Sequence, residues 1–321
     1  MAKANIVVVG SSNTDMIIKL KCIPRSGETL LGGEYLTAAG GKGANQAVAA
    51  ARAGGKVSFV ARVGRDASGD QAIASFIKNG IDVRHVLRDP RAASGTALIF
   101  VASNGENCIA VAPGANSRLS PRDIRRARAF IVRAKTVLMQ LETPLDTVRE
   151  TMSLAASSGV TTILNPAPAR LLPNTLLRQF SIITPNETEA EQLTGIKISG
   201  VTGAKKAATE LRRQGVRRVV VTLGPRGALI ADECGTQLVP GFKVKVVDTT
   251  GAGDVFNGTL AVALAEGYSL RRAVNFANAA AAISVTVWGA QPSAPTRRTI
   301  ERFIEARNVT DELRPRGAVS L

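Results

Sequence analysis

The sequence predicts an α/β fold: a doubly wound, mostly parallel sheet that carries a small antiparallel β flap as a lid. Short β-branched runs alternate with alanine-rich helical patterns along almost the whole chain, which is typical of right-handed βαβ units. Of the 321 residues, 45% are hydrophobic but only 4% are aromatic, so Ala, Val, Ile and Leu must build the core. The predicted strands, in chain order, are Ile6–Val9, Val57–Val63, Val137–Leu141, Thr161–Leu164, Ile182–Thr184 and Val219–Thr222.

Two stretches interrupt this alternation. Residues 14–40 and 94–112 contain strand-like runs separated by turns, without a helical pattern between them. We expect them to form hairpins outside the main sheet that cover the ends of its strands, where a lid would exclude water from a phosphoryl transfer. Residues 1–308 are therefore expected to form one α/β domain. Residues 309–321 are polar, contain Pro315 and Gly317, and are expected to form a loosely held tail.

Composition and motif content exclude several classes of protein. The N-terminus leads directly into a strand without a signal-peptide pattern, and no apolar run could span a membrane. The three cysteines are far apart and lack metal-ligand spacing, so we expect buried or unreactive thiols in a reducing compartment, the cytoplasm. There is no Walker-type phosphate loop, no nucleophile elbow and only one histidine, His85.

The formal net charge of +16 is compatible with binding to nucleic acid, but also with a nucleotide or a sugar phosphate. The basic residues are dispersed over several predicted helices and are not interleaved with aromatics. We therefore interpret the basic surface as solvated, with no nucleic acid and no membrane as partner.

The strongest chemical signal is the run Asp-Thr-Thr-Gly-Ala-Gly-Asp from Asp248 to Asp254, which opens a helical pattern. Glycines in such a turn let backbone N–H groups converge, and the positive end of the helix dipole stabilises an anion there. Asp254 stands at the mouth of the turn, where it can accept a hydroxyl proton during phosphoryl transfer. A helix cap is the alternative role for this aspartate, and the turn alone does not decide between them.

A second glycine run, from Ala39 to Gln46, precedes an alanine-rich helical pattern. Its glycines permit close backbone approach to a ligand, while Lys42 and Asn45 offer donors that suit sugar hydroxyls. Upstream, Asn13 and Asp15 occupy alternate positions of an extended chain and therefore point the same way. An amide and a carboxylate together can hold a vicinal diol. A turn residue and a solvated carboxylate are the alternatives for these two side chains.

Together these motifs resemble the PfkB family of carbohydrate kinases, in the branch that phosphorylates ribose, from about Ile6 to Phe303. Both glycine runs occur in the expected order, and three further segments agree: Asn165–Arg170, Thr184–Glu189 and Gly289–Ser293. The resemblance implies transfer of the ATP γ-phosphoryl group to the 5-hydroxyl of D-ribose, with Mg²⁺ and K⁺ as cofactors and a homodimer as the assembly. Another sugar or nucleoside kinase, such as a 2-deoxyribose kinase, and a non-catalytic sugar or nucleotide sensor are the alternatives.

The resemblance also implies roles for individual residues. Asp254 would be the catalytic base, and Gly251, Ala252 and Gly253 would form the anion hole for the transferred group. The implied sugar contacts are Ser11, Asn13, Asp15, Gly40, Gly41, Lys42, Asn45, Glu142 and Asp254. The implied nucleotide and Mg²⁺ contacts are Asn186, Glu189, Thr222, Gly224, Arg226, Gly227, Gly253 and Asn278. The implied K⁺ site, built mainly of carbonyl oxygens, comprises Asp248, Thr250, Ser284, Val287, Gly289 and Ser293.

Two of these assignments carry a qualification of their own. Asn186 and Glu189 match an Asn-x-x-Glu element that organises Mg²⁺ and phosphate through water, a use that suits hard oxygen ligands. Asn278 stands where the family often has a histidine near the adenine, so the sequence does not define the contact with the base.

Overall fold

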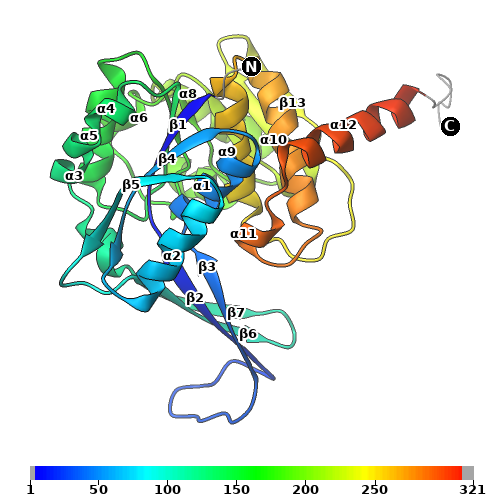
Figure 1. Ribbon diagram of the computed structural model, residues 1–321. Coiled ribbons are helices and arrows are strands. Elements are labelled where there is room, and N and C mark those ends of the chain that lie inside the picture. The colour runs from blue at the N-terminus through cyan, green and yellow to red at the C-terminus, as the bar shows by residue number, and fades with distance from the viewer. Residues whose placement is uncertain (1–3, 313–321) are drawn as a thin grey trace, which may run out of the picture.

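A computed structural model describes residues 4–312 of the protein (Figure 1). Within that range nine strands form one sheet, in the order β13 (Gly235–Val239), β12 (Ala228–Asp232), β11 (Val219–Thr222), β10 (Ile182–Ile183), β9 (Thr161–Leu164), β8 (Thr136–Met139), β1 (Asn5–Val9), β4 (Lys56–Gly64) and β5 (Asp82–Asp89). Pairing is parallel from β5 to β11 and antiparallel between β11, β12 and β13. The predicted mostly parallel α/β fold is confirmed.

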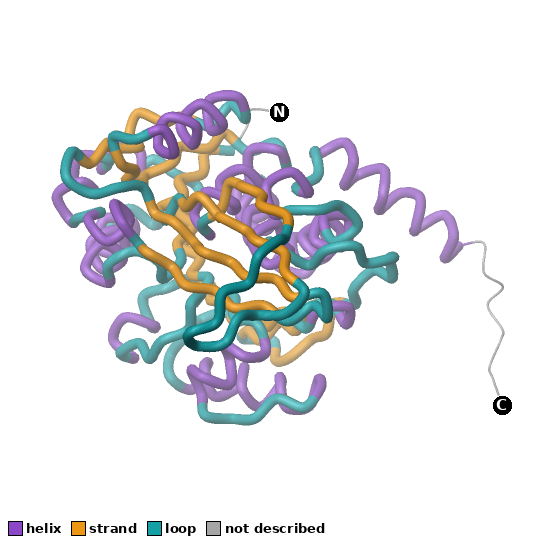
Figure 2. Tube along the Cα trace, turned by 90° about the horizontal axis from the view of Figure 1, so that it is seen from below, coloured by secondary structure: helices purple, strands orange, loops and turns teal. Residues whose placement is uncertain are grey.

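Helices cover both faces of this sheet (Figures 1 and 2). One face packs against α1 (Lys42–Arg52), α2 (Ala67–Lys78), α9 (Ala252–Ala265), α10 (Leu270–Ser284) and α12 (Arg297–Glu312). The other face packs against α3 (Pro121–Arg126), α4 (Arg128–Ile131), α5 (Leu145–Ala156), α6 (Asn174–Leu177), α7 (Glu187–Thr194) and α8 (Gly200–Arg213). The short helix α11 (Ala290–Ser293) lies between α10 and α12 in the chain.

The side chains of β1 alternate between two hydrophobic cores. Ile6 and Val8 pack into the core on the α1 side, whereas Val7 and Val9 pack into the core on the α5 side. All four side chains are at most 2% exposed, and each such burial stabilises the fold by about 1.5–3 kcal/mol. Because both faces of the strand are covered, its sequence is a continuous apolar run, which is the pattern that predicts the central strands.

A second sheet forms the flap. Among the residues that the structure describes, it contains four strands in the order β3 (Glu34–Gly40), β2 (Asn13–Leu20), β6 (Gly95–Ala102) and β7 (Asn107–Ala112). The β2–β3 and β6–β7 hairpins are antiparallel, as expected, but β2 and β6 pair in parallel because both strands leave the body in the same direction. The flap is therefore a mixed sheet, since its two hairpins lie side by side with the same orientation.

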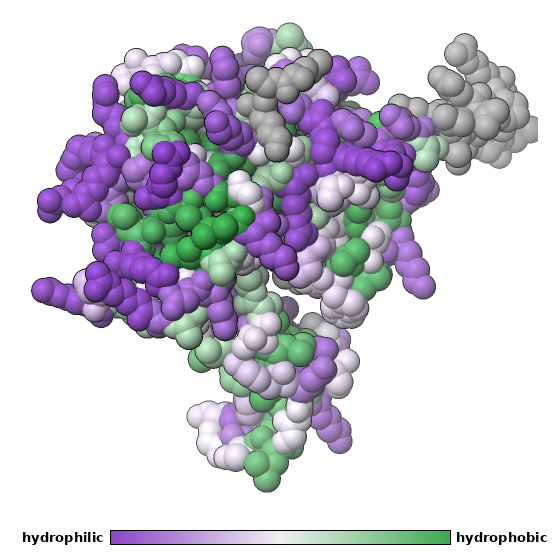
Figure 3. All heavy atoms as spheres, viewed as in Figure 1, coloured by the Kyte–Doolittle hydropathy of each residue, from purple (hydrophilic) through white to green (hydrophobic). Residues whose placement is uncertain are grey.

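The flap projects from the body and exposes apolar side chains (Figures 1 and 3). Tyr35, Leu98, Ile109 and Val111 are between 47% and 60% exposed. The register of the strands places Tyr35 and Leu98 on one face of the flap and Ile109 and Val111 on the other. Exposed apolar side chains on a projecting sheet are typical of an interaction site.

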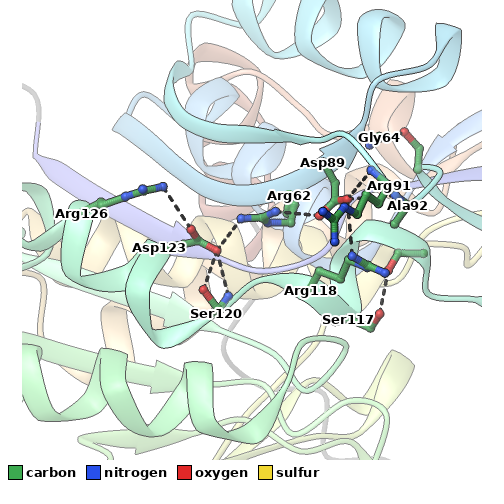
Figure 4. Close-up of polar contacts among 12 residues, drawn as sticks. Arg62, Gly64, Asp89, Arg91, Ala92, Ser117, Arg118, Ser120, Asp123 and Arg126 are labelled. Carbon is green, nitrogen blue, oxygen red and sulfur yellow. Dashed lines mark hydrogen bonds and ion pairs between the residues drawn. The ribbon is translucent and has the colours of Figure 1, made fainter.

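A buried ionic cluster holds the base of the flap (Figure 4). Arg62 of β4 donates to Asp89 at the end of β5 (2.7 Å) and to Asp123 of α3 (2.9 Å), and both carboxylates are at most 3% exposed. Asp89 also accepts the backbone N–H groups of Arg91 and Ala92, at 2.9 Å each, in the turn that leads into β6. Removing the guanidinium would leave two buried charges unpaired, so these segments are held firmly together.

Three local features add to the sequence-based expectations or depart from them. The cysteines are exposed and free, so of the two expectations, buried or unreactive thiols, burial is wrong, and the lack of reactivity stays a prediction. Helix α12 includes residues 309–312, and the remainder of the expected tail, residues 313–321, lies outside the described part of the chain. No helix within residues 4–312 is both long and apolar enough to cross a membrane.

Candidate active site

The first turns of α1 and α9 meet at the carboxyl ends of the central strands. A cavity of about 170 Å³ lies beside them. The predicted site residues that line it are Lys42, Asn186, Glu189, Thr222 and residues 251–254. Sequence reasoning assigned no role to four further lining residues, Asn165, Thr184, Thr249 and Asn257, although the first three stand in motifs that it singled out.

Glycine is required where α1 begins. Gly41 has φ of 87°, a conformation that other residues rarely adopt. A Cβ on Gly43 would lie 2.5 Å from the backbone nitrogen of Ser11, so α1 packs directly on the connection between β1 and β2. The helix starts at Lys42, earlier than its alanine-rich part indicates. The second glycine run therefore forms the first turn of the helix.

Asp254 is a buried carboxylate in the first turn of α9. Its Oδ2 accepts a hydrogen bond from Asn45 Nδ2 and its Oδ1 accepts one from Gln46 Nε2, both at 2.9 Å. Burial raises the pKa of Asp254, while Lys42 and the two amides partly oppose that rise. The carboxylate faces α1 and makes no capping bond to its own helix, which argues against the cap as its role.

Amide side chains hold the partners of Asp254 in turn. Gln46 Oε1 accepts from Gln140 Nε2 (2.5 Å), and Gln46 Nε2 also donates to Asn165 Oδ1 (3.0 Å). Asn45 Oδ1 accepts from Gln291 Nε2 (3.2 Å). These bonds fix which end of each amide faces the carboxylate. The sequence carried no signal for this pairing, because its members come from four distant segments.

Unbonded backbone N–H groups lie at the start of α9. Gly251 has φ of 74°, and a Cβ there would lie 2.7 Å from the Ala290 side chain. The N–H of Ala252 donates to the carbonyl of Thr249 (3.2 Å). Within residues 4–312, the N–H groups of Gly251, Gly253 and Asp254 donate to no group. Of the predicted anion hole, Gly251 and Gly253 thus have free N–H groups, as does Asp254, whereas the N–H of Ala252 is bound within the turn.

Three carboxylates, those of Asp15, Glu142 and Asp254, lie close enough to interact electrostatically. Burial, and then the charges of Glu142 and Asp254, raise the pKa of Asp15 to about 6. Glu142 accepts the backbone N–H of Lys42 (2.9 Å) and the hydroxyl of Ser11. Ser11 is fully buried and its hydroxyl is bound to Glu142, so its direct contact with a sugar stays a prediction.

Lys42 remains charged between these carboxylates and the cavity. Burial alone would lower the pKa of its ammonium group, but Asp254, Glu142 and Glu189 together raise it above the ordinary value. A permanent positive charge here offsets part of the negative charge that the site concentrates, and it lines the same cavity as the anion hole.

Asn186 and Glu189 form the capping box of α7. Glu189 Oε2 accepts the backbone N–H of Asn186 (2.9 Å), Glu189 Oε1 accepts Asn186 Nδ2 (3.0 Å), and Asn186 Oδ1 accepts the N–H of Glu189 (2.8 Å). Burial raises the pKa of Glu189. Each of its carboxylate oxygens accepts one hydrogen bond and keeps a second lone pair, and this oxygen donor set fits a Mg²⁺ ion held through water.

Of the other predicted nucleotide contacts, Gly227 and Asn278 contact the segment 239–241. Arg226, at the end of η2 (Gly224–Arg226), pairs with Glu187 of α7 (2.6 Å). Gly227 has φ of 94°, and a Cβ on it would lie 2.2 Å from the carbonyl oxygen of Val239, so both its backbone conformation and close packing require this glycine. Asn278 Nδ2 donates to the carbonyls of Val239 and Pro240, at 3.2 Å each.

The predicted cation loop is held together by Asp248. Its carboxylate accepts the N–H of Gly289 (2.8 Å) and both the N–H (2.9 Å) and the hydroxyl (2.7 Å) of Thr250. Although burial raises it, the pKa of Asp248 is lowered overall by these bonds, so the carboxylate stays charged. The hydroxyls of Ser284 and Ser293 bind carbonyls of their own helices. One carboxylate among carbonyl oxygens fits a monovalent hard cation.

Comparison with known proteins agrees with this geometry. The model of the pfkB family of carbohydrate kinases matches residues 3–297. The chain belongs to this family. Ribokinase of Haemophilus influenzae is 45% identical over 303 residues, which are 94% of this chain and 99% of that protein. Deoxyribokinase of Salmonella typhi is 38% identical over 302 residues, which are 94% of this chain and 98% of that protein.

A solved structure is similar to this carbohydrate kinase throughout. The structure of Arabidopsis thaliana ribokinase complexed with ribose and ATP superposes with a TM-score of 0.87 and 33% sequence identity, and the match covers 94% of this chain and 99% of that chain. The flap and the main sheet of this carbohydrate kinase thus form the fold of ribokinase structures, and the enzyme is an ATP-dependent sugar kinase.

Sugar binding to this carbohydrate kinase is expected to weaken as the pH falls through about 6. Only the ionised Asp15 carboxylate offers a negative charge and two acceptor oxygens to sugar hydroxyls, and its raised pKa brings protonation to that pH. Calorimetric titration with sugar from about pH 5 to 8 should show this loss.

The variant Asp15→Asn should bind sugar weakly at every pH, without the loss near pH 6. Because Asp15, Glu142 and Asp254 titrate as one cluster, this comparison isolates the part that belongs to Asp15. Asp70→Asn, at an exposed aspartate of α2, is the matched control. An unchanged affinity of the unmodified protein across that range would contradict the expectation.

Proposed function

We propose that the protein is a ribokinase, which transfers the γ-phosphoryl group of ATP to the 5-hydroxyl of D-ribose and forms D-ribose 5-phosphate. The observation that carries the proposal is the buried Asp254, held by Asn45 and Gln46 beside the free N–H groups of the α9 turn. In-line phosphoryl transfer to a hydroxyl needs a proton acceptor next to an anion site. A relative named ribokinase at 45% identity, and a ribokinase structure complexed with ribose and ATP, support ribose as the sugar.

The chain's own groups account for the chemical step. Asp254 accepts the proton of the sugar's 5-hydroxyl. The oxygen of that hydroxyl forms the new bond to the γ-phosphorus, while the bond from this phosphorus to the ADP oxygen breaks. The N–H groups of Gly253 and Asp254 then stabilise charge on the transferred group, together with the ammonium of Lys42. No covalent intermediate with the protein is needed.

Two metal ions complete the proposal. Mg²⁺ would neutralise charge on the ATP phosphates, and Asn186 and Glu189 are the residues that would hold it, through water. K⁺ would bind at the loop that Asp248 joins to Gly289. That loop runs into Gly251 and the anion hole, so an ion there would order the N–H groups that receive the phosphoryl group.

We propose that the enzyme is a homodimer joined through its flaps. The support is the apolar side chains that the flap exposes, Tyr35 and Leu98 on one face and Ile109 and Val111 on the other. A second copy packed against the flap would remove such side chains from water, and a two-fold interface needs only one self-complementary patch. A cytoplasmic location stays a prediction of the sequence.

Deoxyribokinase is the second candidate function. The observation that favours it is the relative named deoxyribokinase, 38% identical over nearly the whole of both chains. Because a single hydroxyl separates the two sugars, one polar contact in the site can decide between them.

Replacing Asp254 by Asn is expected to lower kcat by at least about 100-fold, because the amide cannot accept the proton. Its NH₂ group would also face a donor of Asn45 or Gln46, which would cost about 1–3 kcal/mol of stability. Turnover, melting temperature and ribose binding should therefore be measured together, with Asp70→Asn as control. Near-normal turnover in a folded Asp254→Asn variant would contradict the assignment of Asp254 as the proton acceptor.

Ribose is expected to exceed 2-deoxyribose in kcat/KM by about 5 to 150-fold, because the missing hydroxyl leaves a buried donor or acceptor unpaired. A coupled assay of ADP release over pentoses, hexoses and nucleosides measures this ratio. If 2-deoxyribose proves the better substrate, the second candidate replaces the first while the kinase mechanism stands.

Exchanging K⁺ for Na⁺ or Tris is expected to reduce kcat more than it weakens ribose binding. The proposed ion orders the loop of Asp248 and Gly251 without touching the sugar. Steady-state kinetics in the three salts, at equal ionic strength, test this. Turnover that is indifferent to the monovalent cation would remove K⁺ from the proposal.

A further inference from the structure

Asn116 is a buried amide at the base of the flap that the mechanism above does not use. It lies in the short helix η1 (Gly114–Arg118), directly after β7, and is 2% exposed. Its Oδ1 accepts the backbone N–H of Ser12 (2.9 Å). Its Nδ2 donates to the carbonyl oxygen of Ser12 (3.1 Å) and to Asn13 Oδ1 (2.7 Å).

These bonds fix the orientation of the Asn116 amide, which in turn fixes that of the Asn13 amide. A backbone N–H can only donate and a backbone carbonyl can only accept, so Ser12 defines both ends of the Asn116 amide. The Nδ2 of Asn116 must then meet the oxygen of Asn13. The nitrogen of Asn13 is thereby left over, and within residues 4–312 it donates to no group.

Asn116 itself is held independently of any ligand. The neighbouring Ala115 N–H donates to the carbonyl of Ala93 (2.8 Å), which ties η1 to the turn before β6. The cluster of Arg62, Asp89 and Asp123 fixes the segments on both sides of η1, and Arg118 approaches Asp89 at 3.9 Å (Figure 4). The orientation of Asn116 is therefore set by the fold.

We propose that Asn116 is a positioning residue that makes Asn13 a hydrogen-bond donor to one sugar hydroxyl, beside the acceptor Asp15. This inference deepens the proposed sugar kinase function and rests on it. The site then selects a sugar with two neighbouring hydroxyls, one that accepts from Asn13 and one that donates to Asp15. If a sugar lacks the accepting oxygen, the Nδ2 donor of Asn13 stays unpaired, because Asn116 prevents the amide from rotating.

The variant Asn116→Asp tests the proposal with almost no change in size. The new carboxylate still accepts the N–H of Ser12 but offers no donor to Asn13, so the Asn13 amide is expected to rotate and present its oxygen to the sugar. KM for ribose should rise by at least about five-fold, the effect of one lost hydrogen bond, while kcat changes less. The preference for ribose over 2-deoxyribose or 3-deoxyribose, whichever lacks the hydroxyl that Asn13 contacts, should shrink by a similar factor.

A double-mutant cycle separates positioning from a general loss of structure. In the background of Asn13→Ala, the change Asn116→Asp should have little further effect on KM, because its effect runs through Asn13. Asn79→Asp is the matched control: this amide at the end of α2 donates to the carbonyl of Ser75 (2.8 Å), away from the sugar residues. It should leave KM unchanged.

A second variant covers the case that Asn116→Asp does not fold. A Cβ on Gly95 would lie 2.2 Å from both Asn116 Nδ2 and Asn13 Oδ1, so Gly95→Ala should separate the pair and raise KM in the same way. An unchanged KM in a folded variant would overturn the inference and leave the proposed function standing. So would changes in KM for Asn13→Ala and Asn116→Asp that are fully additive in the double variant. If the unmodified protein phosphorylates no sugar, the proposed function fails, and the inference fails with it.

Discussion

The burial of the Asp254 carboxylate is the constraint on which the rest of the site depends. A buried carboxylate without partners is costly and takes up a proton, so it must be paired to remain a proton acceptor. Asn45 and Gln46 supply the hydrogen bonds and Lys42 supplies the opposite charge, and all three stand in the first turns of α1. The first turns of α1 and α9 must therefore meet. Gly258 of α9 permits this close approach, because a Cβ there would lie 2.5 Å from the carbonyl oxygen of Gln46.

The same constraint extends to side chains that never touch the carboxylate. An amide offers a donor at one end and an acceptor at the other, so a free amide beside Asp254 could turn its oxygen toward it. Gln140 and Asn165 prevent this for Gln46, and Gln291 prevents it for Asn45. The ends of β8 and β9 and the helix α11 are thereby fixed around one carboxylate. Asn116 acts on Asn13 by the same principle. The backbone groups of Ser12 fix the orientation of the Asn116 amide, and the Asn116 amide fixes the orientation of the Asn13 amide.

The sequence predicts the parts of this arrangement that leave a local pattern. Strands buried on both faces are continuous β-branched runs, and Gly41 and Gly251 are required by positive φ, so the sheet and both glycine turns could be predicted. Strands β12 and β13 form an antiparallel pair at the sheet edge, where that pattern is weak. The buried role of Ser11 and the amide partners of Asp254 depend on contacts between segments up to 246 residues apart, and no local pattern reports these.

Hydrogen bonds at the base of the flap anchor two of its strands, β2 and β6. Asp66 accepts both the N–H (2.7 Å) and the hydroxyl (2.6 Å) of Ser94 where β6 begins, and Asn116 holds Asn13 where β2 begins. Both strands are therefore anchored at the end nearest the body, while their far ends meet water. In the proposed sugar kinase, a bending motion that admits substrate would pivot beyond these anchors, and it would move the tip of the flap without moving Asn13. Water exclusion would then depend on the far end of the flap and sugar orientation on its anchored end, which keeps the polar contacts preorganised.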